Sequence, residues 1–219
     1  MTHNKTFPRA TGEKGVRKMK KEDRLQVLVT SALLCAVGIL IPMFCPKIVI
    51  GPASFTLASH VPVFLAMFIS PGAAVAVSLG TTLGFFAAQF QPVVVLRALS
   101  HIVFATAGAY WLKKNRGLLA SPGGAVLFGV VTSVVHVAME ILVVTYFFFG
   151  DQLSEANYAS GYFVSVLLLV GIGGFVHSLI DYFISLAVWK PVVRTVRFPV
   201  SVRAVLSRRS AASTPRRED

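Results

Sequence analysis

The sequence predicts an all-α integral membrane protein with six transmembrane helices and both termini in the cytoplasm. Composition is the first reason: 55% of the 219 residues are hydrophobic and 14% are charged, with a mean hydropathy of +0.71. A soluble domain of this length does not need so much apolar material. The placement of Lys and Arg is the second reason: of 21, eight lie in residues 1–24, three in the turn 113–116 and eight in residues 190–219. The net charge of +12 therefore indicates membrane topology rather than nucleic-acid binding.

Six apolar segments account for the predicted helices, because crossing the hydrocarbon core takes about 20 residues. Several boundaries coincide with helix-breaking residues, such as the turn Ser70-Pro71-Gly72 and the segment Ser121-Pro122-Gly123-Gly124. Within the third segment, the motif Gly80-x-x-x-Gly84 predicts close packing against neighbouring helices. The predicted spans are residues 25–44, 54–70, 73–90, 93–112, 121–149 and 161–189.

An even number of spans puts both basic tails on one side of the membrane, and the positive-inside rule makes that side the cytoplasm. The loops 45–52, 89–92 and 150–160 then face outward, with Lys47 as their one basic residue. We therefore expect three parts in the chain. They are a basic cytoplasmic tail at 1–24, a six-helix transmembrane substrate-binding domain at 25–190, and a disordered basic cytoplasmic tail at 191–219.

Ionisable side chains recur inside three of these spans as pairs spaced four residues apart. Charged or titratable groups in hydrocarbon cost several kcal/mol, roughly 2.5–3.5 for Arg, Lys or Asp at a helix centre, so they face a bundle interior or a cavity. A spacing of four places both members of a pair on one helical face. The pairs are Arg97 with His101, His136 with Glu140, and His177 with Asp181.

The depth of each residue, counted at 1.5 Å per residue from the outer helix ends, separates these groups. The count predicts a substrate-binding layer in the outer half of the membrane, made of His60, Arg97, His101 and Glu140, with His136 at its floor. It places His177 and Asp181 deeper, where we expect them to hold or move helices. Two interpretations of Arg97 and Glu140 stay open at this point. The residues bind the solute, or they form a structural ion pair with each other, because intramembrane charges usually pair.

Aromatic residues gather at the outer ends of the last two spans, where an interfacial belt is the common interpretation. Among them, Tyr158 and Tyr162 are also candidates for stacking on a flat ligand that enters from outside. We include both in the predicted substrate-binding set.

The sequence lacks the common motifs of ATP-binding proteins, hydrolases and metal sites. It contains no phosphate-binding loop, no H-E-x-x-H, no G-x-S-x-G and no cysteine metal cluster, and H136-V-A-M-E140 alone is a weak metal signal. We therefore expect no enzyme activity, no metal site and no cofactor. A six-span protein with an outward pocket and no energy source suggests a binding subunit that depends on partners for ATP.

Two motifs in this context resemble a known family. Ala32-Leu33-Leu34-Cys35-Ala36 on the first span and the segment from Pro52 to Pro62 are similar to the substrate-binding S components of energy-coupling factor (ECF) vitamin transporters. The resemblance implies a bacterial plasma membrane protein. It also implies that Ala32 and Ala36 pack on a transmembrane coupling subunit carrying two ATPases, and that the loop 45–53 is an outward lid.

The solute is suggested by a finer similarity. Residues 54–71 and Arg97-x-x-x-His101 resemble the niacin branch, in which Arg97 would take a carboxylate and His or Tyr the pyridine nitrogen. Biotin, pantothenate or a queuosine precursor also suit parts of this pocket, whereas the start Met1-Thr2-His3 departs from the Met-His start of the nickel and cobalt members. The alternatives from other classes are a self-contained proton-coupled secondary transporter or channel using Glu140, His136 and Asp181, and a structural membrane protein.

Overall fold

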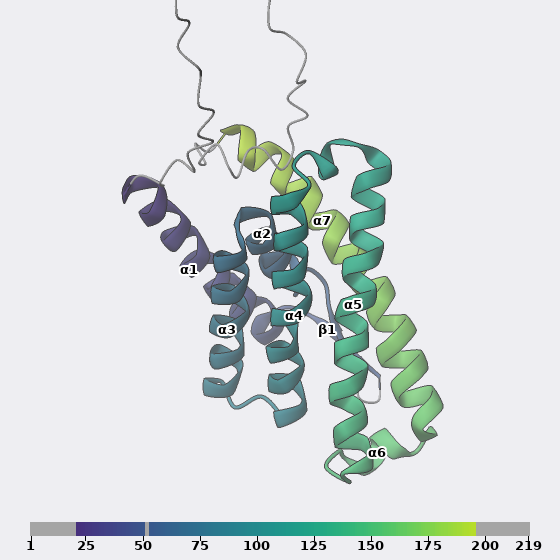
Figure 1. The fold of residues 1–219 in the computed structure, drawn as a ribbon. Helices are drawn as coiled ribbons and strands as arrows, with labels where there is room; N and C mark the ends of the chain where they lie inside the picture. The colour runs from purple at the N-terminus through teal and green to yellow at the C-terminus, as the bar shows by residue number, and fades with distance from the viewer. Residues whose placement is uncertain (1–20, 51–52, 196–219) are drawn as a thin grey trace, which may run out of the picture.

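The computed structural model describes residues 21–50 and 53–195, so most of both predicted tails lies outside the described residues. Its elements are a helical bundle with one β-hairpin (Figure 1). The helices are α1 (Lys21–Phe44), α2 (Val61–Ile69), α3 (Pro71–Ala87), α4 (Pro92–Lys114), α5 (Pro122–Phe149), the short α6 (Glu155–Tyr158), and a last helix that starts as the π-helix η2 (Phe163–Gly173) and continues as α7 (Gly174–Thr195). A 3-10 turn, η1 (Leu118–Ala120), precedes α5, and β1 (Lys47–Ile50) pairs antiparallel with β2 (Ala53–Thr56).

Helix starts follow the predicted proline signals. Pro71, Pro92 and Pro122 each occupy the first helical position, where a missing N–H costs nothing. Two of these helices are also capped by serine. The Ser70 hydroxyl accepts a hydrogen bond from the Ala73 N–H at 3.1 Å, and the Ser121 hydroxyl accepts one from Gly124 at 3.2 Å.

The second predicted span, 54–70, is wrong in its boundaries. Its first part is the strand β2, and the helix α2 has only nine residues, or about 14 Å at 1.5 Å per residue. The predicted loop 45–52 likewise contains the strand β1. Hydropathy alone cannot separate these forms, because an apolar hairpin followed by a short helix has the same composition as one long helix.

Among the described residues, four helical stretches are long and apolar enough to cross a membrane. These are α1, α4, α5 and the continuous stretch Phe163–Val193, while α3 is a shorter apolar helix of 17 residues. The first residues of α1, the last of α7 and the turn between α4 and α5 lie at the same end of the bundle (Figure 1). The α3–α4 connection and α6 lie at the opposite end.

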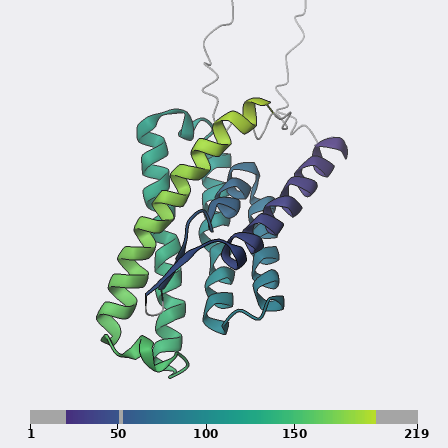
Figure 2. The same ribbon diagram turned by 180° about the vertical axis from the view of Figure 1, so that it is seen from behind.

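The bundle encloses α2 and leaves α1 largely uncovered. Eight of the nine residues of α2 are buried. The N-terminal half of α1 projects away from the other helices (Figures 1 and 2), and its side chains are mostly exposed. The predicted glycine motif on α3 lies in close contact with α1. A Cβ added at Gly80 would lie 2.5 Å from the sulfur of Cys35, and one added at Gly84 would overlap Ile39. The close packing predicted for this motif is confirmed.

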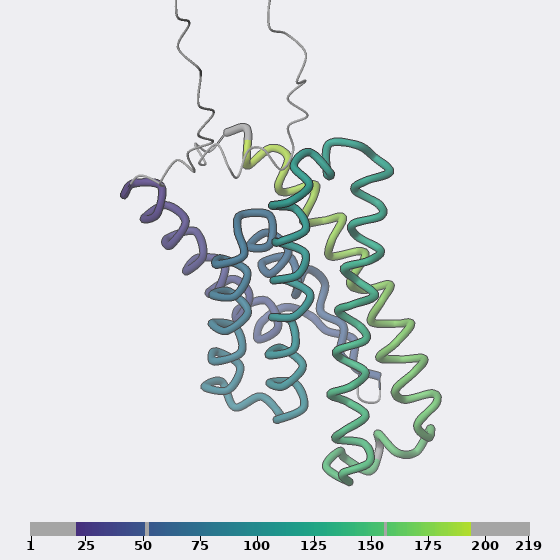
Figure 3. The backbone as a smooth tube through the Cα atoms, in the orientation of Figure 1, coloured from purple at the N-terminus to yellow at the C-terminus, as the bar shows by residue number. Residues whose placement is uncertain are grey.

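An aromatic core fills the half of the bundle that contains the turn between α4 and α5 and the end of α7. Its rings contact one another at centroid distances of 5.5 to 6.3 Å. The members with almost no exposed surface are Phe64, Phe68, Phe104, Phe128, Tyr182 and Trp189. The tube in Figure 3 shows that α5 and the last helix extend well past the α3–α4 connection at the other end.

Candidate functional site

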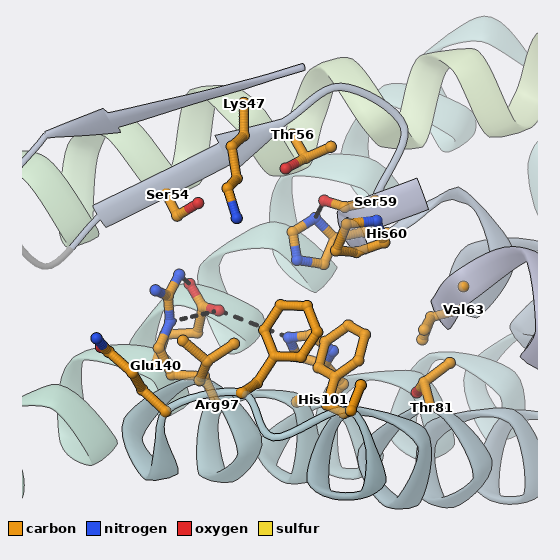
Figure 4. A pocket seen from close by; sticks show the side chains of 18 of the residues that line it. Lys47, Ser54, Thr56, Ser59, His60, Val63, Thr81, Arg97, His101 and Glu140 are labelled. Carbon is orange, nitrogen blue, oxygen red and sulfur yellow. Dashed lines mark hydrogen bonds and ion pairs between the residues drawn. The ribbon is translucent and has the colours of Figure 1, made fainter. Parts of the chain in front are cut away.

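A pocket of about 450 Å³ lies between the hairpin and helices α1 to α5. The hairpin turns one face to it, because alternate strand residues point the same way: the cross-strand partners Lys47 and Thr56 both line the pocket, as do Val49 and Ser54. The opposite wall is formed by α4 and α5 (Figure 4). The hairpin therefore covers one side of the pocket, and its role as an outward lid stays a prediction.

The opposite wall carries a buried ion pair between α4 and α5. Arg97 binds Glu140 with two bonds, from Nε to Oε1 and from Nη2 to Oε2, both 3.1 Å long. Exposed fractions are 9% for Arg97 and 2% for Glu140. The mutual pair, one of the two interpretations left open from sequence, is present, and such two-bond pairs are strong and geometrically specific. It does not exclude the other interpretation, because a charge pair that lines a pocket can also bind a solute.

Histidines surround the same carboxylate. The Nε2 atoms of His101 and His136 each lie 3.5 Å from Glu140 Oε1. The His60 ring lies 5.0 Å from that of His101 and 4.6 Å from that of His136, centroid to centroid. His60, Arg97, His101 and Glu140 line the pocket, while His136 lies behind them and is 1% exposed. The structure thus brings these five predicted residues together; their role in binding a solute stays a prediction.

Asp181 anchors the turn between the hairpin and α2. Its carboxylate is fully buried and accepts hydrogen bonds from the backbone N–H groups of Ala58, at 2.7 Å, and His60, at 2.9 Å. It also contacts His60 Nδ1 at 3.1 Å and His177 Nε2 at 3.4 Å. Ala58 has a φ of +67°, a left-handed conformation that the anchored turn imposes. A carboxylate at this helix N-terminus is also favoured by the helix dipole.

The predicted separation in depth between His177 with Asp181 and the other polar residues is wrong. His60 contacts both groups, with its ring 5.1 Å from that of His177. The count failed for two reasons. The hairpin carries His60 into the bundle, and α5 and the last helix extend past α3 and α4, so their outer ends do not share one plane (Figure 3).

The two predicted tyrosines are not brought to the pocket. The Tyr158 hydroxyl accepts a hydrogen bond from the Leu153 N–H at 3.0 Å, and the Tyr162 hydroxyl bonds with Thr145 at 2.9 Å. Both rings pack against Phe148. Their contacts match the interfacial belt, the interpretation that sequence also offered.

Sequence reasoning missed the polar face of the hairpin, formed by Lys47, Ser54 and Thr56, and the pocket wall of Phe85 and Phe90. The two phenylalanine rings stack at 4.8 Å, and Lys47 Nζ lies 6.0 Å from the Phe90 ring centroid. A signal was present, since a run of β-branched residues before Gly51-Pro52 is typical of a hairpin strand.

Ala32 and Ala36, the predicted partner contacts, lie one turn apart on α1 and are both exposed. Large apolar side chains beside them are exposed as well, including Leu33 and Val37. This helix therefore offers a continuous apolar surface outside the bundle.

Comparison with known proteins gives one informative match. No family model matches the chain, and no solved structure matches it. It is 42% identical over 183 residues to the niacin transporter NiaX of Lactococcus lactis subsp. cremoris (strain MG1363), an alignment that covers 83% of this chain and 80% of that protein. The chain therefore belongs to the family of this niacin transporter, in agreement with its resemblance to ECF S components, and is a multi-pass transport protein of the bacterial cell membrane rather than an enzyme.

Proposed function

We propose that this chain captures niacin from outside the cell as the substrate-binding S component of an ECF importer. Besides its relationship to NiaX, the observation that carries the proposal is the charge and shape of the pocket. Its lining contains two cations, Lys47 and Arg97, and one carboxylate, Glu140, so it suits a solute with a negative charge. Niacin is a flat pyridine ring with one carboxylate.

The pocket residues suggest how niacin binds. Lys47 reaches toward the interior from the hairpin (Figure 4) and supplies a charge-assisted bond to the carboxylate, while the guanidinium of Arg97 adds a second positive charge in the wall. The phenyl faces of Phe85 and Phe90 offer a stacking surface to the pyridine ring. His60, His101 and Glu140 complete the pocket and His136 supports them from behind, whereas Tyr158 and Tyr162 drop out of the proposed set.

The proposal extends to topology and partners. The chain crosses the membrane six times. The hairpin and α2 jointly form the second crossing, and α1, α3, α4, α5 and the last helix form one crossing each. Both chain ends, with the basic tails 1–24 and 191–219, then lie in the cytoplasm. Ala32 and Ala36 contact a transmembrane coupling subunit whose two ATPases supply the energy, because the chain itself has no phosphate-binding loop. The exposed apolar face of α1 supports this contact.

Binding of niacin to the purified chain tests the proposal directly. Lys47→Met is expected to weaken binding by about tenfold or more, because a hydrogen bond to a charged group is worth about 1.5–3 kcal/mol. Lys113→Met is the matched control: Lys113 also lies over an aromatic ring, at 5.9 Å from that of Tyr110, but at the opposite end of the bundle. Nicotinamide, which lacks the carboxylate, should bind much more weakly than niacin. Equal binding of both compounds, or no niacin binding, would contradict the proposal.

Uptake assays test the partner surface. Ala32→Trp and Ala36→Trp are expected to leave niacin binding unchanged and to abolish uptake in vesicles that contain the coupling subunit and ATPases, because an indole prevents close helix contact. Leu83→Trp, on the exposed side of α3, is the control and should retain uptake. Uptake by the chain alone with only an ion gradient would overturn the ECF assignment and favour a secondary transporter.

A further inference from the structure

We infer that His60, His101, His136 and Glu140 form a binding site for a divalent transition-metal ion of the zinc class, at the inner wall of the pocket. Each residue offers one ligand atom, and these four atoms all lie within 4.8 Å of one another. Three imidazole nitrogens and one carboxylate oxygen are a donor set that zinc binds with tetrahedral geometry.

Two distances within the cluster, those from Glu140 Oε1 to His101 and His136, fit an ion better than hydrogen bonds. The separations of 3.5 Å from Glu140 Oε1 to His101 Nε2 and His136 Nε2 exceed the usual range for an N–H···O bond. They match the edge of a tetrahedron around zinc, about 3.3–3.5 Å for metal–ligand bonds of about 2.0–2.1 Å. Within the described part of the chain, neither nitrogen has a hydrogen-bond partner, although both are buried. A bound ion satisfies both at once.

The outer contacts of the ligands have the arrangement that metal sites use. Metal-binding histidines usually donate their second ring N–H to a carboxylate or another acceptor, which fixes the ring and directs the other nitrogen to the ion. His60 Nδ1 contacts Asp181 Oδ2 at 3.1 Å, and His136 Nδ1 contacts Ser178 Oγ at 3.0 Å. Both contacts leave Nε2 for the ion. Arg97 in turn fixes the carboxylate of Glu140.

A second group, His60 with His177 and Asp181, also has ligand atoms in range. Its ring nitrogens already have polar partners, since His60 Nδ1 contacts Asp181 and His177 Nε2 contacts Ser59 Oγ at 3.2 Å. Its carboxylate also holds the turn through two backbone N–H bonds. Glu140 is engaged as well, with Arg97, but the two nitrogens that face its Oε1 have no hydrogen-bond partner among the described residues. We therefore place the ion in the first group and assign Asp181 to its outer shell.

The charges around the ion connect this site with the solute, a step that rests on the proposed function. A divalent ion, Arg97 and Lys47 carry four positive charges, and Glu140 and Asp181 carry two negative charges. Two positive charges remain, and a monocarboxylate such as niacin neutralises one of them in a low-dielectric environment. Niacin is thus expected to bind more tightly when the ion is present.

This inference replaces the expectation from sequence that the chain has no metal site. That expectation considered motifs within single segments, among them His136 with Glu140 on one helix. The additional ligands come from α4 and from the residue before α2; sequence reasoning placed them in the same layer but did not consider them as ligands of one ion.

Metal content of the full chain tests the site. The protein is purified through a streptavidin-binding tag, which contains no polyhistidine, stripped with EDTA and dialysed against Zn²⁺ or Co²⁺. We expect one ion per chain by mass spectrometry and the intense visible absorption of tetrahedral Co²⁺. His136→Ala and His101→Ala should lose the ion, while His177→Ala, a neighbouring histidine outside the four, should keep it. Size-exclusion chromatography of each variant checks that it is folded.

The inference is wrong if the wild-type protein takes up no stoichiometric ion, whatever the variants do. It is also wrong if His177→Ala loses the ion while His136→Ala keeps it. Niacin binding measured on the same samples separates the two proposals. Niacin binding without any metal uptake removes the metal site and leaves the proposed function intact. Metal uptake without niacin binding supports the metal site and contradicts the proposed function.

Discussion

The two halves of this bundle are both buried but are held together differently. Around Phe64, Phe128 and Tyr182, aromatic rings contact one another and one hydroxyl, that of Tyr182, donates to the Ala125 carbonyl at 2.7 Å. Around Arg97 and Glu140, polar and directional contacts hold the buried carboxylate. The halves meet where the Phe104 ring lies 4.5 Å from that of His136.

The difference indicates which half carries function. Apolar packing is non-directional and needs no hydrogen-bond partner, whereas a buried polar atom without a partner costs free energy. A membrane protein gains no stability from a polar cluster that an apolar core could not supply. The polar half is therefore the one expected to bind the solute, and mutations should separate the two halves.

The largest effect is expected from breaking the ion pair. Arg97→Met leaves the Glu140 carboxylate buried without its guanidinium, and we expect a loss of about 3–5 kcal/mol of unfolding free energy. Denaturation in detergent, followed by the fluorescence of Trp111 and Trp189, measures the loss. Niacin binding should be lost in the same variant.

Two controls sharpen this result. The double variant Arg97→Met with Glu140→Met removes both charges, so most of the stability should return while niacin binding does not. Phe128→Leu, in the aromatic half, should cost about 1–3 kcal/mol through the cavity it leaves and should keep niacin affinity unchanged. A double variant as unstable as Arg97→Met would show that the pair is not the source of the loss.

A smaller effect is expected from Asp181→Asn. The substitution replaces a charged acceptor that holds two backbone N–H groups, and we expect a loss of about 1.5–3 kcal/mol. Because these contacts fix the turn beneath the hairpin, hydrogen exchange should rise at Ala58 and in β1 and β2 before it rises in the aromatic core. Uniform exchange across the protein would contradict a local anchoring role.

Much of the bundle could be predicted from local signals. Proline with a preceding serine predicts where α3 and α5 begin, and Gly80 with Gly84 predicts the close contact with α1. The i, i+4 spacing also predicts correctly that His136 and Glu140 face the same way. These signals work because each depends on residues within one turn or one helical face.

The rest depends on contacts between distant segments. Hydropathy gave no reason to divide residues 54–70 into a strand and a short helix. Because the hairpin was not predicted, Lys47 was assigned to a loop and was not recognised as a cation of the pocket. Depth counting assumed helix ends in one plane and so separated His60 from Asp181, which are in contact. Register between helices is set by packing, which no single segment encodes.

The smallest effect is expected at the outer aromatic belt. Tyr162→Phe removes one hydroxyl that bonds with Thr145 at 2.9 Å, away from both the aromatic core and the Arg97–Glu140 cluster, and should cost about 0.5–1.5 kcal/mol. Niacin affinity should not change, because the pocket wall is formed by the hairpin and helices α1 to α5. Titration of niacin into this variant is the measurement. A clear loss of affinity would return Tyr162 to the binding set, as sequence first suggested, and would mean that the outer ends of the last two helices move toward the solute when it binds.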